Sequence, residues 1–354
     1  MSGGVDSSVA AALMTESGYE CVGVTMKLYD NDDIGIPREH SCCSLSDVED
    51  ARSAAFRLGM KYYVFNFSDD FSEKVIDKFV DVYENGGTPN PCIDCNRFMK
   101  FDKLYKRAEI LGCDTIVTGH YARIEYNEEQ GRYLLKKSLN EQKDQSYVLY
   151  FMTQEQLAST CFPLGEYTDK IHVRAVAEKY GFVNANKPDS QDICFVPDGN
   201  YADFIRERTG KDYPEGDFVD TEGNILGRHK GIIKYTIGQR KGLGLALKAP
   251  MYVCKKDIQS NRVVLTTGEK LFCKEMIVDD FNWIYEKPEK EIRVKARTRY
   301  HAKEADAVAS VLPNGRVKVV FEFAHKAVAV GQAAVLYDGD YVVGGGTIAE
   351  TVSD

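Results

Sequence analysis

Apolar positions in the first two hundred residues follow two periodicities in turn. Helical spacing of about 3.6 residues alternates with short runs of period two or of continuous apolar character. Helices of about a dozen residues between strands predict a parallel sheet with both faces covered, a doubly wound α/β fold. The elements predicted in this part are a helix to residue 18, strand 19–26, helix 46–59, strand 61–67, helices 69–85 and 97–111, and strand 113–118.

From about residue 210 the helical pattern fades, and short alternating segments are separated by turn signals. This change predicts a small central domain and then a C-terminal β-barrel or sandwich. With joints near residues 205 and 268, the expected domains are 1–205, 206–268 and 269–354. The predicted strands are 251–255, 262–266, 292–297, 317–323 and 333–337, and the turn signals stand at 222–224, 242–244, 338–339 and 344–346.

The chain opens on a glycine-rich stretch that runs directly into the first helical pattern. Two adjacent glycines flanked by serines let the backbone fold so that several N–H groups point at one anion, and a helix N-terminus adds positive dipole. Neither the P-loop spacing nor the dinucleotide spacing of glycines is present. We therefore predict a phosphate-binding loop of another class, in the sequence Met1-Ser2-Gly3-Gly4-Val5-Asp6-Ser7-Ser8.

In a doubly wound fold the phosphate loop follows a central strand, yet no residue stands before Met1 in this sequence. A sheet without its central strand would leave buried backbone groups unpaired, at about 1–3 kcal/mol each. We expect that the sequence starts at an internal Met of a longer reading frame.

Two further stretches carry cysteines between predicted helices. The first is Asn90-Pro91-Cys92-Ile93-Asp94-Cys95-Asn96, where Asn-Pro disfavours helix, so a loop is expected. Cys95 would then stand just before a helix that begins near Arg97, and a helix N-terminus lowers the pKa of a thiol. The second is Ser190-Gln191-Asp192-Ile193-Cys194-Phe195, whose cysteine, taken alone, is equally a packed thiol.

Chain length, apolar runs, cysteine content and net charge limit the classes of protein to which the chain can belong. The chain has 354 residues, enough for two or three domains, with no apolar run near 18 residues and no cationic leader, so a cytoplasmic protein without a membrane partner is expected. Its ten cysteines in so long a chain indicate thiol chemistry or metal binding rather than a disulfide scaffold. The net charge of −9 excludes wholesale coating of nucleic acid.

Local basic surfaces are nevertheless present. Arg293, Lys295, Arg297 and Arg299 occupy alternate positions, so a strand would place all four on one face. A second basic cluster surrounds glycine-rich turns. Two such surfaces can hold a phosphate backbone with salt-sensitive binding, although solvated strand charges would give the same pattern. The second cluster consists of Arg228, Lys230, Lys234, Arg240 and Lys241.

Together the motifs resemble a known family. The opening Ser-Gly-Gly-x-Asp-Ser resembles the pyrophosphate loop of the PP-loop ATP pyrophosphatases. In order along essentially the whole chain, the motifs are similar to those of the tRNA-specific 2-thiouridylases, the MnmA family. The further motifs are Asn-Pro-Cys-x-x-Cys-Asn at 90–96, Thr-Gly-His-Tyr-Ala at 118–122, Lys-Asp-Gln-Ser-Tyr at 143–147, Ser-Gln-Asp-Ile-Cys-Phe at 190–195, Thr-Ile-Gly-Gln-Arg-Lys-Gly-Leu-Gly at 236–244, and Gly-Gln-Ala-Ala-Val at 331–335 with three glycines at 344–346.

The resemblance implies sulfur transfer to C2 of the wobble uridine in the tRNAs for Lys, Glu and Gln. The C2 oxygen would attack the α phosphate of ATP, with Mg2+, and release pyrophosphate. A persulfide on Cys194, loaded by a cysteine desulfurase or a sulfur-relay protein, would then deliver sulfur. Cys95 would be the nucleophile that helps to release it, leaving a Cys95–Cys194 disulfide that needs reduction.

The same resemblance assigns ligand contacts. Asp6 could hold Mg2+, but a lone carboxylate there is equally compatible with helix capping. His120 without its motif would be a structural histidine. The implied ATP-binding residues are Ser2, Gly3, Gly4, Val5, Asp6, Ser7, Ser8, Met26 and Gly119, and the implied tRNA-binding residues are Asn90, Pro91, Cys92, His120, Lys143, Asp144, Gln145, Arg299, Tyr300 and Gln332.

Several alternatives remain open. Some members of the family have Asp where this chain has Cys92, so Cys92, Cys95 and Cys194 could instead hold a [4Fe–4S] cluster that carries sulfide. A zinc site that includes Cys42 and Cys43 ranks third, because adjacent cysteines are poorly spaced ligands. An amidating or ligating ATP pyrophosphatase would share the loop but has no reason to carry the cysteines. Without its first strand, the protein could be a tRNA-binding module that lacks catalysis.

Overall fold

The computed structural model describes residues 1–29, 45–189, 193–196 and 199–352. These residues divide into two compact units. The first unit comprises Met1–Ile76, Cys92–Asn200 and Asp340–Val342, and the second comprises Asp77–Pro91, Tyr201–Gly339 and Val343–Asp354. No helix in the described part of the chain is long and apolar enough to span a membrane.

The three strands predicted for the first unit are present, and a fourth strand, which the sequence analysis did not predict, pairs with the third of them. β1 (Val22–Lys27) pairs in parallel with β2 (Lys61–Asn66), and β3 (Ile116–Val117) pairs in parallel with β6 (Thr160–Cys161). Within the described residues these pairs form two separate two-stranded sheets. Met1 lies beside β1, where its carbonyl oxygen accepts a hydrogen bond of 2.6 Å from Thr25 Oγ1.

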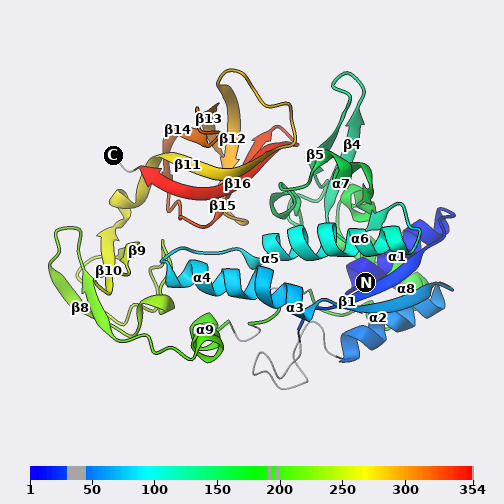
Figure 1. The fold of residues 1–354 in the computed structure, drawn as a ribbon, viewed down its shortest axis with the longest axis horizontal. Coiled ribbons are helices and arrows are strands. Elements are labelled where there is room, and N and C mark those ends of the chain that lie inside the picture. The colour runs from blue at the N-terminus through cyan, green and yellow to red at the C-terminus, as the bar shows by residue number, and fades with distance from the viewer. Residues whose placement is uncertain (30–44, 190–192, 197–198, 353–354) are drawn as a thin grey trace. The chain divides into compact units, whose positions relative to one another are not determined.

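In the first unit, α1 (Val5–Glu16) packs against α8 (Lys170–Lys179) (Figure 1). Val9 and Ala12 of α1 share a buried cluster with Val173 and Ala177 of α8, because spacings of three and four residues place them on facing stripes. The other helices of this unit, including π-helical (η2, η3) and 3-10 (η4, η5) segments, are α2 (Leu45–Arg57), α3 (Ser68–Phe71), η2 (Ser72–Asp77), α5 (Pro91–Asp94), η3 (Cys95–Lys103), α6 (Leu104–Ile110), η4 (Ser146–Val148), α7 (Gln154–Ala158) and η5 (Pro163–Glu166).

The first unit also contains a hairpin that the sequence analysis did not predict. It consists of β4 (Ala122–Asn127) and β5 (Arg132–Lys137), which pair antiparallel. Lys136 of β5 pairs with Tyr341, the first residue of β16. The hairpin begins immediately after His120 and Tyr121, so it fixes the position of that motif.

The second unit begins with α4 (Lys78–Glu84), the continuation of the helix predicted over 69–85. Tyr83 of α4 stacks on Tyr201 of α9 (Tyr201–Thr209), with ring centroids 4.7 Å apart. The central part of the unit is a four-stranded sheet in the order β8-β7-β10-β9. Its strands are β7 (Gly216–Val219), β8 (Ile225–His229), β9 (Met251–Asp257) and β10 (Arg262–Thr267).

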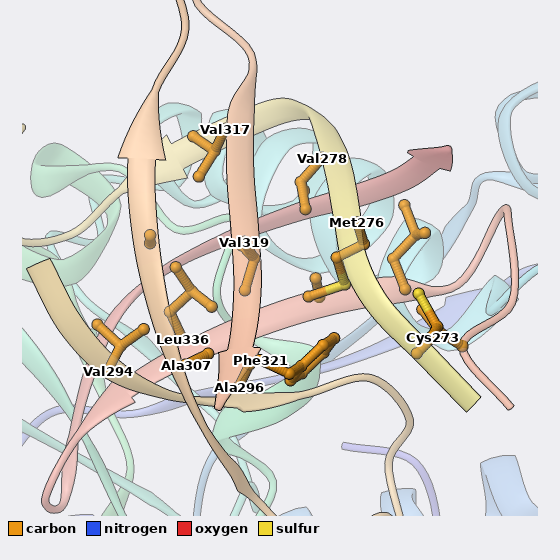
Figure 2. Packing of buried hydrophobic residues seen from close by; sticks show 14 of the residues in the cluster. Cys273, Met276, Val278, Val294, Ala296, Ala307, Val317, Val319, Phe321 and Leu336 are labelled. Carbon is orange, nitrogen blue, oxygen red and sulfur yellow. The ribbon is translucent and has the colours of Figure 1, made fainter. Parts of the chain in front are cut away.

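The C-terminal part closes into a six-stranded barrel, because β11 pairs with both β14 and β16. Closure leaves no unpaired sheet edge. Met276, Val319, Phe321 and Leu336 point into a common apolar core (Figure 2). The strands are β11 (Phe272–Trp283), β12 (Ile292–Arg297), β13 (Ala305–Val311), β14 (Val317–Lys326), β15 (Ala333–Asp338) and β16 (Tyr341–Val352).

One turn prediction is wrong. The three glycines at 344–346 lie inside β16 rather than in a turn. A Cβ on Gly344 would stand 2.3 Å from the carbonyl oxygen of Asn282, and one on Gly346 would stand 2.4 Å from that of Asp279. Glycine is therefore required by the close approach of the β11 backbone.

Candidate active site

The glycine-rich loop has a fixed backbone. Gly3 has φ +76°, and a Cβ there would lie 2.4 Å from the carbonyl oxygen of Asp47, so no other residue fits without movement. Ser7 Oγ accepts the Ser2 N–H at 3.1 Å and donates to the Gly4 carbonyl at 3.1 Å. Gly4 is the N-cap of α1 and provides no side-chain cap. The loop thus folds tightly before a helix N-terminus, as predicted for an anion site.

Two residues distant in sequence support this loop. Asn184 Nδ2 donates to the Gly3 carbonyl at 2.8 Å and to Ser8 Oγ at 3.1 Å. A Cβ on Gly119, which follows β3, would lie 2.7 Å from the Ser7 nitrogen. Gly119 is therefore beside the loop, as the predicted ATP site requires. Met26 is half-buried near the end of β1.

A chain of charges begins at Asp6 and was missed by the sequence analysis. Lys170 Nζ lies 2.6 and 2.7 Å from the two carboxylate oxygens of Asp6 and 2.9 Å from Asp189 Oδ1. Lys143 Nζ binds the other oxygen of Asp189 at 2.7 Å. Burial opposes ionisation of Asp189, but hydrogen bonds from both lysines outweigh burial and lower its pKa. The loop is thereby connected to a lysine of the predicted tRNA-binding set.

The contacts of Asp6 differ from those of a helix cap. Its Oδ1 accepts a hydrogen bond of 2.9 Å from Tyr121 Oη, and Lys170 contacts both of its oxygens. Among the residues that the structure describes, Asp6 belongs to no group of three potential metal ligands.

The structure corrects the expected setting of Cys95. Helix begins at Pro91, not near Arg97, and runs without a break through α5, η3 and α6 to Ile110. Proline suits the first helical position, where its missing N–H is not needed. Cys92 is exposed in the first turn, whereas Cys95 is half-buried one turn further along. Burial raises the pKa of Cys95 to about 11, against a smaller opposite effect of Lys100.

Cys194 is placed near the carboxyl end of β1. Its carbonyl oxygen accepts a hydrogen bond of 2.8 Å from Tyr29 Oη, two residues after β1 ends. The next residue, Phe195, is buried against Phe71, with ring centroids 5.8 Å apart. Cys194 therefore lies in a packed segment, as the reading of a packed thiol expected. The packing holds the cysteine near the carboxyl end of a strand, where an open α/β sheet binds ligands. Residues 190–192 of the same motif lie outside the described residues.

The metal alternatives find no support in this geometry. Among the residues that the structure describes, no three Cys, His, Asp or Glu side chains are grouped to hold a metal ion. Cys92, Cys95 and Cys194 are all described, so as arranged here they do not fit a [4Fe–4S] cluster. Cys42 and Cys43, proposed for zinc, lie outside the described residues.

The chain was compared with known proteins. A model described as "tRNA methyl transferase HUP domain" matches residues 1–198, a "PRC-barrel domain" of the same series matches 202–267, and an "Aminomethyltransferase beta-barrel domain" matches 273–348. The tRNA-specific 2-thiouridylase MnmA of Clostridioides difficile is 52% identical over 99% of this chain and 97% of its own length. That of Acetivibrio thermocellus is 55% identical over 98% and 97%. The chain belongs to the MnmA family.

The residues of this chain that the resemblance to the MnmA family implies as tRNA-binding differ in their burial and in their hydrogen-bond partners. His120 is buried, 2.7 Å from Thr118 Oγ1 and 3.5 Å from Lys100 Nζ, and burial lowers its pKa well below 6.5. Asp144 is also buried, and its carboxylate accepts hydrogen bonds from the Ser138 and Ser146 backbones. Both settings are typical of structural roles.

The remaining residues of that set differ in exposure. Gln145 Oε1 accepts the Tyr121 N–H at 3.0 Å, so this side chain holds the backbone of the 118–122 motif. Arg299 is exposed just after β12, next to half-buried Tyr300. Gln332 Nε2 donates to the carbonyls of Thr88 and Pro89. Asn90 and Pro91 follow directly and lead into α5.

Two of the four basic residues predicted to share a strand face of the barrel are paired with acidic side chains. Arg293 and Lys295 point outward from β12, as predicted from their alternation. Lys295 Nζ is 3.5 Å from Asp306, and Arg297 binds Glu304 at 2.8 Å. The acids come from the neighbouring segment at 304–306, which local spacing could not indicate. Arg299 lies beyond the end of the strand, so the four do not share one strand face.

Proposed function

We propose that this chain is a tRNA-specific 2-thiouridylase, the activity printed in the names of its full-length relatives. The observation that carries the proposal is the placement of the rigid Ser2–Ser8 loop in the same compact unit as Cys95 and Cys194. An adenylating enzyme of another type would need the loop but not the two thiols. A tRNA-binding module would need neither.

The loop would bind ATP through its backbone N–H groups and the N-terminus of α1. Gly3 and Gly119 support this role because both leave space for close backbone approach. Lys170, already beside the loop through Asp6, would add positive charge near the phosphates. Attack by the uridine C2 oxygen on the α phosphate would then expel pyrophosphate and leave an adenylated base.

The sulfur steps would follow at the cysteines. The terminal sulfur of a Cys194 persulfide attacks C2 of the adenylated uridine. The Cys95 thiolate then attacks Cys194 Sγ and breaks the S–S bond, and the electrons released to the transferred sulfur expel AMP. The products are 2-thiouridine and a Cys95–Cys194 disulfide, which an external dithiol reduces. Because burial raises the pKa of Cys95, its deprotonation would need a change of setting when substrates bind.

The partners and domains follow from the same proposal. The substrates would be the tRNAs for Lys, Glu and Gln, and a cysteine desulfurase or relay protein would load Cys194. Mg2+ would arrive with ATP. We propose residues 1–205 as the catalytic domain of PP-loop type, 206–268 as a central domain and 269–354 as a tRNA-contacting barrel. Arg299 supports the last role because it is exposed outside a strand.

The decisive experiment compares wild-type protein with Cys194→Ala. Unmodified tRNA for Lys is incubated with Mg-ATP and a persulfide donor, with and without iron reconstitution, and nucleosides are measured by mass spectrometry. We expect 2-thiouridine without iron from the wild type. The variant should lose at least about a thousandfold in product, because it lacks the sulfur carrier, while tRNA-dependent release of pyrophosphate continues.

The other outcomes separate the alternatives. Product only after iron reconstitution would replace the persulfide by a cluster. Pyrophosphate release without any thiolated product would indicate a different adenylating enzyme. Binding of tRNA with no saturable ATP site would leave a binding module.

A further inference from the structure

Residues 86–91 lead from the end of α4 into the first residue of α5. Side chains donate hydrogen bonds to three successive backbone carbonyls of this segment. Lys256 Nζ donates to Gly87 at 3.3 Å, and Gln332 Nε2 donates to Thr88 at 2.9 Å and to Pro89 at 3.3 Å. In the opposite direction, the Thr88 N–H donates to the Val330 carbonyl at 3.1 Å. The chain then enters α5 at Pro91, one residue before Cys92.

Close packing leaves this segment little freedom. A Cβ on Gly87 would lie 2.8 Å from Val82 Cγ1, and one on Gly331 would lie 3.1 Å from the Thr88 nitrogen. The segment therefore fits against Gly331 and Gln332 only because glycines stand on both sides. Tight packing around a conformation held by hydrogen bonds gives a single backbone position.

Lys256 is an unusual donor for such a contact. It is 7% exposed, its ammonium group lies 5.4 Å from the centre of the Tyr83 ring, and among the described residues it forms no ion pair. Burial lowers its pKa to about 8. A buried cation without a carboxylate is unfavourable for stability, and the hydrogen bond to the Gly87 carbonyl offsets part of this cost.

Gln332 is held just as firmly on the barrel. Its backbone carbonyl accepts the Ile348 N–H at 2.8 Å, which ties it to β16. The resemblance to the family implies that Gln332 contacts tRNA, but its amide nitrogen already donates to two carbonyls here. A side chain whose own backbone is fixed and whose amide has two carbonyl partners is suited to hold another backbone segment in place.

We propose that Lys256 and Gln332 are positioning residues that fix the backbone of residues 86–91 and thereby the start of the helix that carries Cys92 and Cys95. Neither side chain touches the reacting atoms. The consequence for catalysis rests on the proposed function of Cys95, whereas the fixing of the backbone does not. Loss of either donor leaves a carbonyl unsatisfied and lets the first turn of α5 move.

The test uses the full chain with Lys256→Met and Gln332→Glu. The second exchange keeps size but replaces an N–H donor by an oxygen that repels both carbonyls. Matched controls are Lys255→Met on the same strand and Gln259→Glu, both at exposed positions. Hydrogen exchange of backbone amides over residues 86–95 is measured together with kcat and KM for tRNA in the thiolation reaction. Circular dichroism checks that each variant is folded.

We expect exchange at Thr88 to be about tenfold faster in both variants, because each loses at least one of the hydrogen bonds that hold the segment, and unchanged in the controls. The kcat should fall about fivefold to tenfold, with KM for tRNA within about twofold of the wild type. Lys256→Arg, which keeps a donor, should recover most of the kcat.

Three results would overturn the proposal. Unchanged exchange in both folded variants would show that neither side chain fixes the segment. Faster exchange with unchanged kcat would leave the contacts structural. A rise in KM with unchanged kcat for Gln332→Glu would make Gln332 a tRNA contact. If the wild type makes no 2-thiouridine, the proposed function fails, but the exchange data still decide whether the two residues hold the backbone.

Discussion

The glycine-rich loop and the helix segment that carries Cys92 and Cys95 belong to one unit, but the charges around them differ. Around the loop, Asp6, Lys170, Asp189 and Lys143 alternate in sign, and each charge has a partner within 2.9 Å. At the helix, Cys95 is half-buried, and burial outweighs the opposite effect of Lys100 and raises the pKa of its thiol. The loop has the backbone geometry of an anion site, whereas the proposed nucleophile is held in its protonated form.

This difference suggests an order of events. Under the proposed function, a protonated Cys95 would be a poor nucleophile and would not discharge a persulfide before the substrates bind. A loop whose backbone is already formed would bind ATP without the cost of ordering it. Activation of the thiol would then follow the binding of tRNA.

Gly3→Ala should have the largest effect, because the loop depends on a backbone that only glycine adopts. A positive φ costs a non-glycine residue about 1–3 kcal/mol, and the new Cβ would also overlap the Asp47 carbonyl. We expect ATP affinity, measured by calorimetry, to fall at least about a hundredfold. The matched control is Gly18→Ala, which has a similar φ of +86° but open space around it. Equal ATP affinity in the two folded variants would refute a preformed loop.

Cys95 should make stability depend on pH in a predictable direction. Its pKa is raised from 9.0 to about 11 in the folded state. Between these values the unfolded chain has lost the proton and the folded chain has not, so stability falls as pH rises. Relative to Cys95→Ala, the wild type should lose up to about 3 kcal/mol by pH 11, at about 1.36 kcal/mol for each unit of pKa. Urea unfolding from pH 8 to pH 11 measures this difference, and a constant difference would mean that burial leaves the pKa of Cys95 at its unfolded value.

The sequence predicted the loop better than the helix because the two depend on different information. Gly3 and Gly4 carry their conformational preference locally, so six neighbouring residues indicated the loop and its place before a helix. For Cys95, the Asn-Pro pair was interpreted as a helix breaker. Pro91 instead begins the helix, and the burial that sets the thiol's pKa comes from packing that spacing does not describe.

Long-range contacts explain the other omissions. Lys170 and Asn184 reach the loop across more than 160 residues, and no local pattern marks either. The hairpin over 122–137 has regular alternation in its first strand, but the adjacent Leu134 and Leu135 break the alternation of the second strand, which pairs across the hairpin with the first. Five of the strands from 251 onward, β9, β10, β12, β14 and β15, were predicted because alternation and turn residues are local, whereas β11, β13 and β16 were not. The glycines of β16 were assigned to a turn, since only the pairing with β11 explains them.

Lys170→Met should have the smallest effect and bears on the charged side of the contrast. Removal of the ammonium leaves Asp6 with an unpaired negative charge beside the proposed phosphate site, so KM for ATP should rise about tenfold with little change in KM for tRNA. Lys179→Met is the control, because it lies on the same helix and breaks an exposed pair with Glu16. A tenfold rise in only the first variant requires that Lys170 acts on the nucleotide. If both variants keep the wild-type KM, the four charges only hold the fold together, and the loop backbone alone prepares the site for ATP.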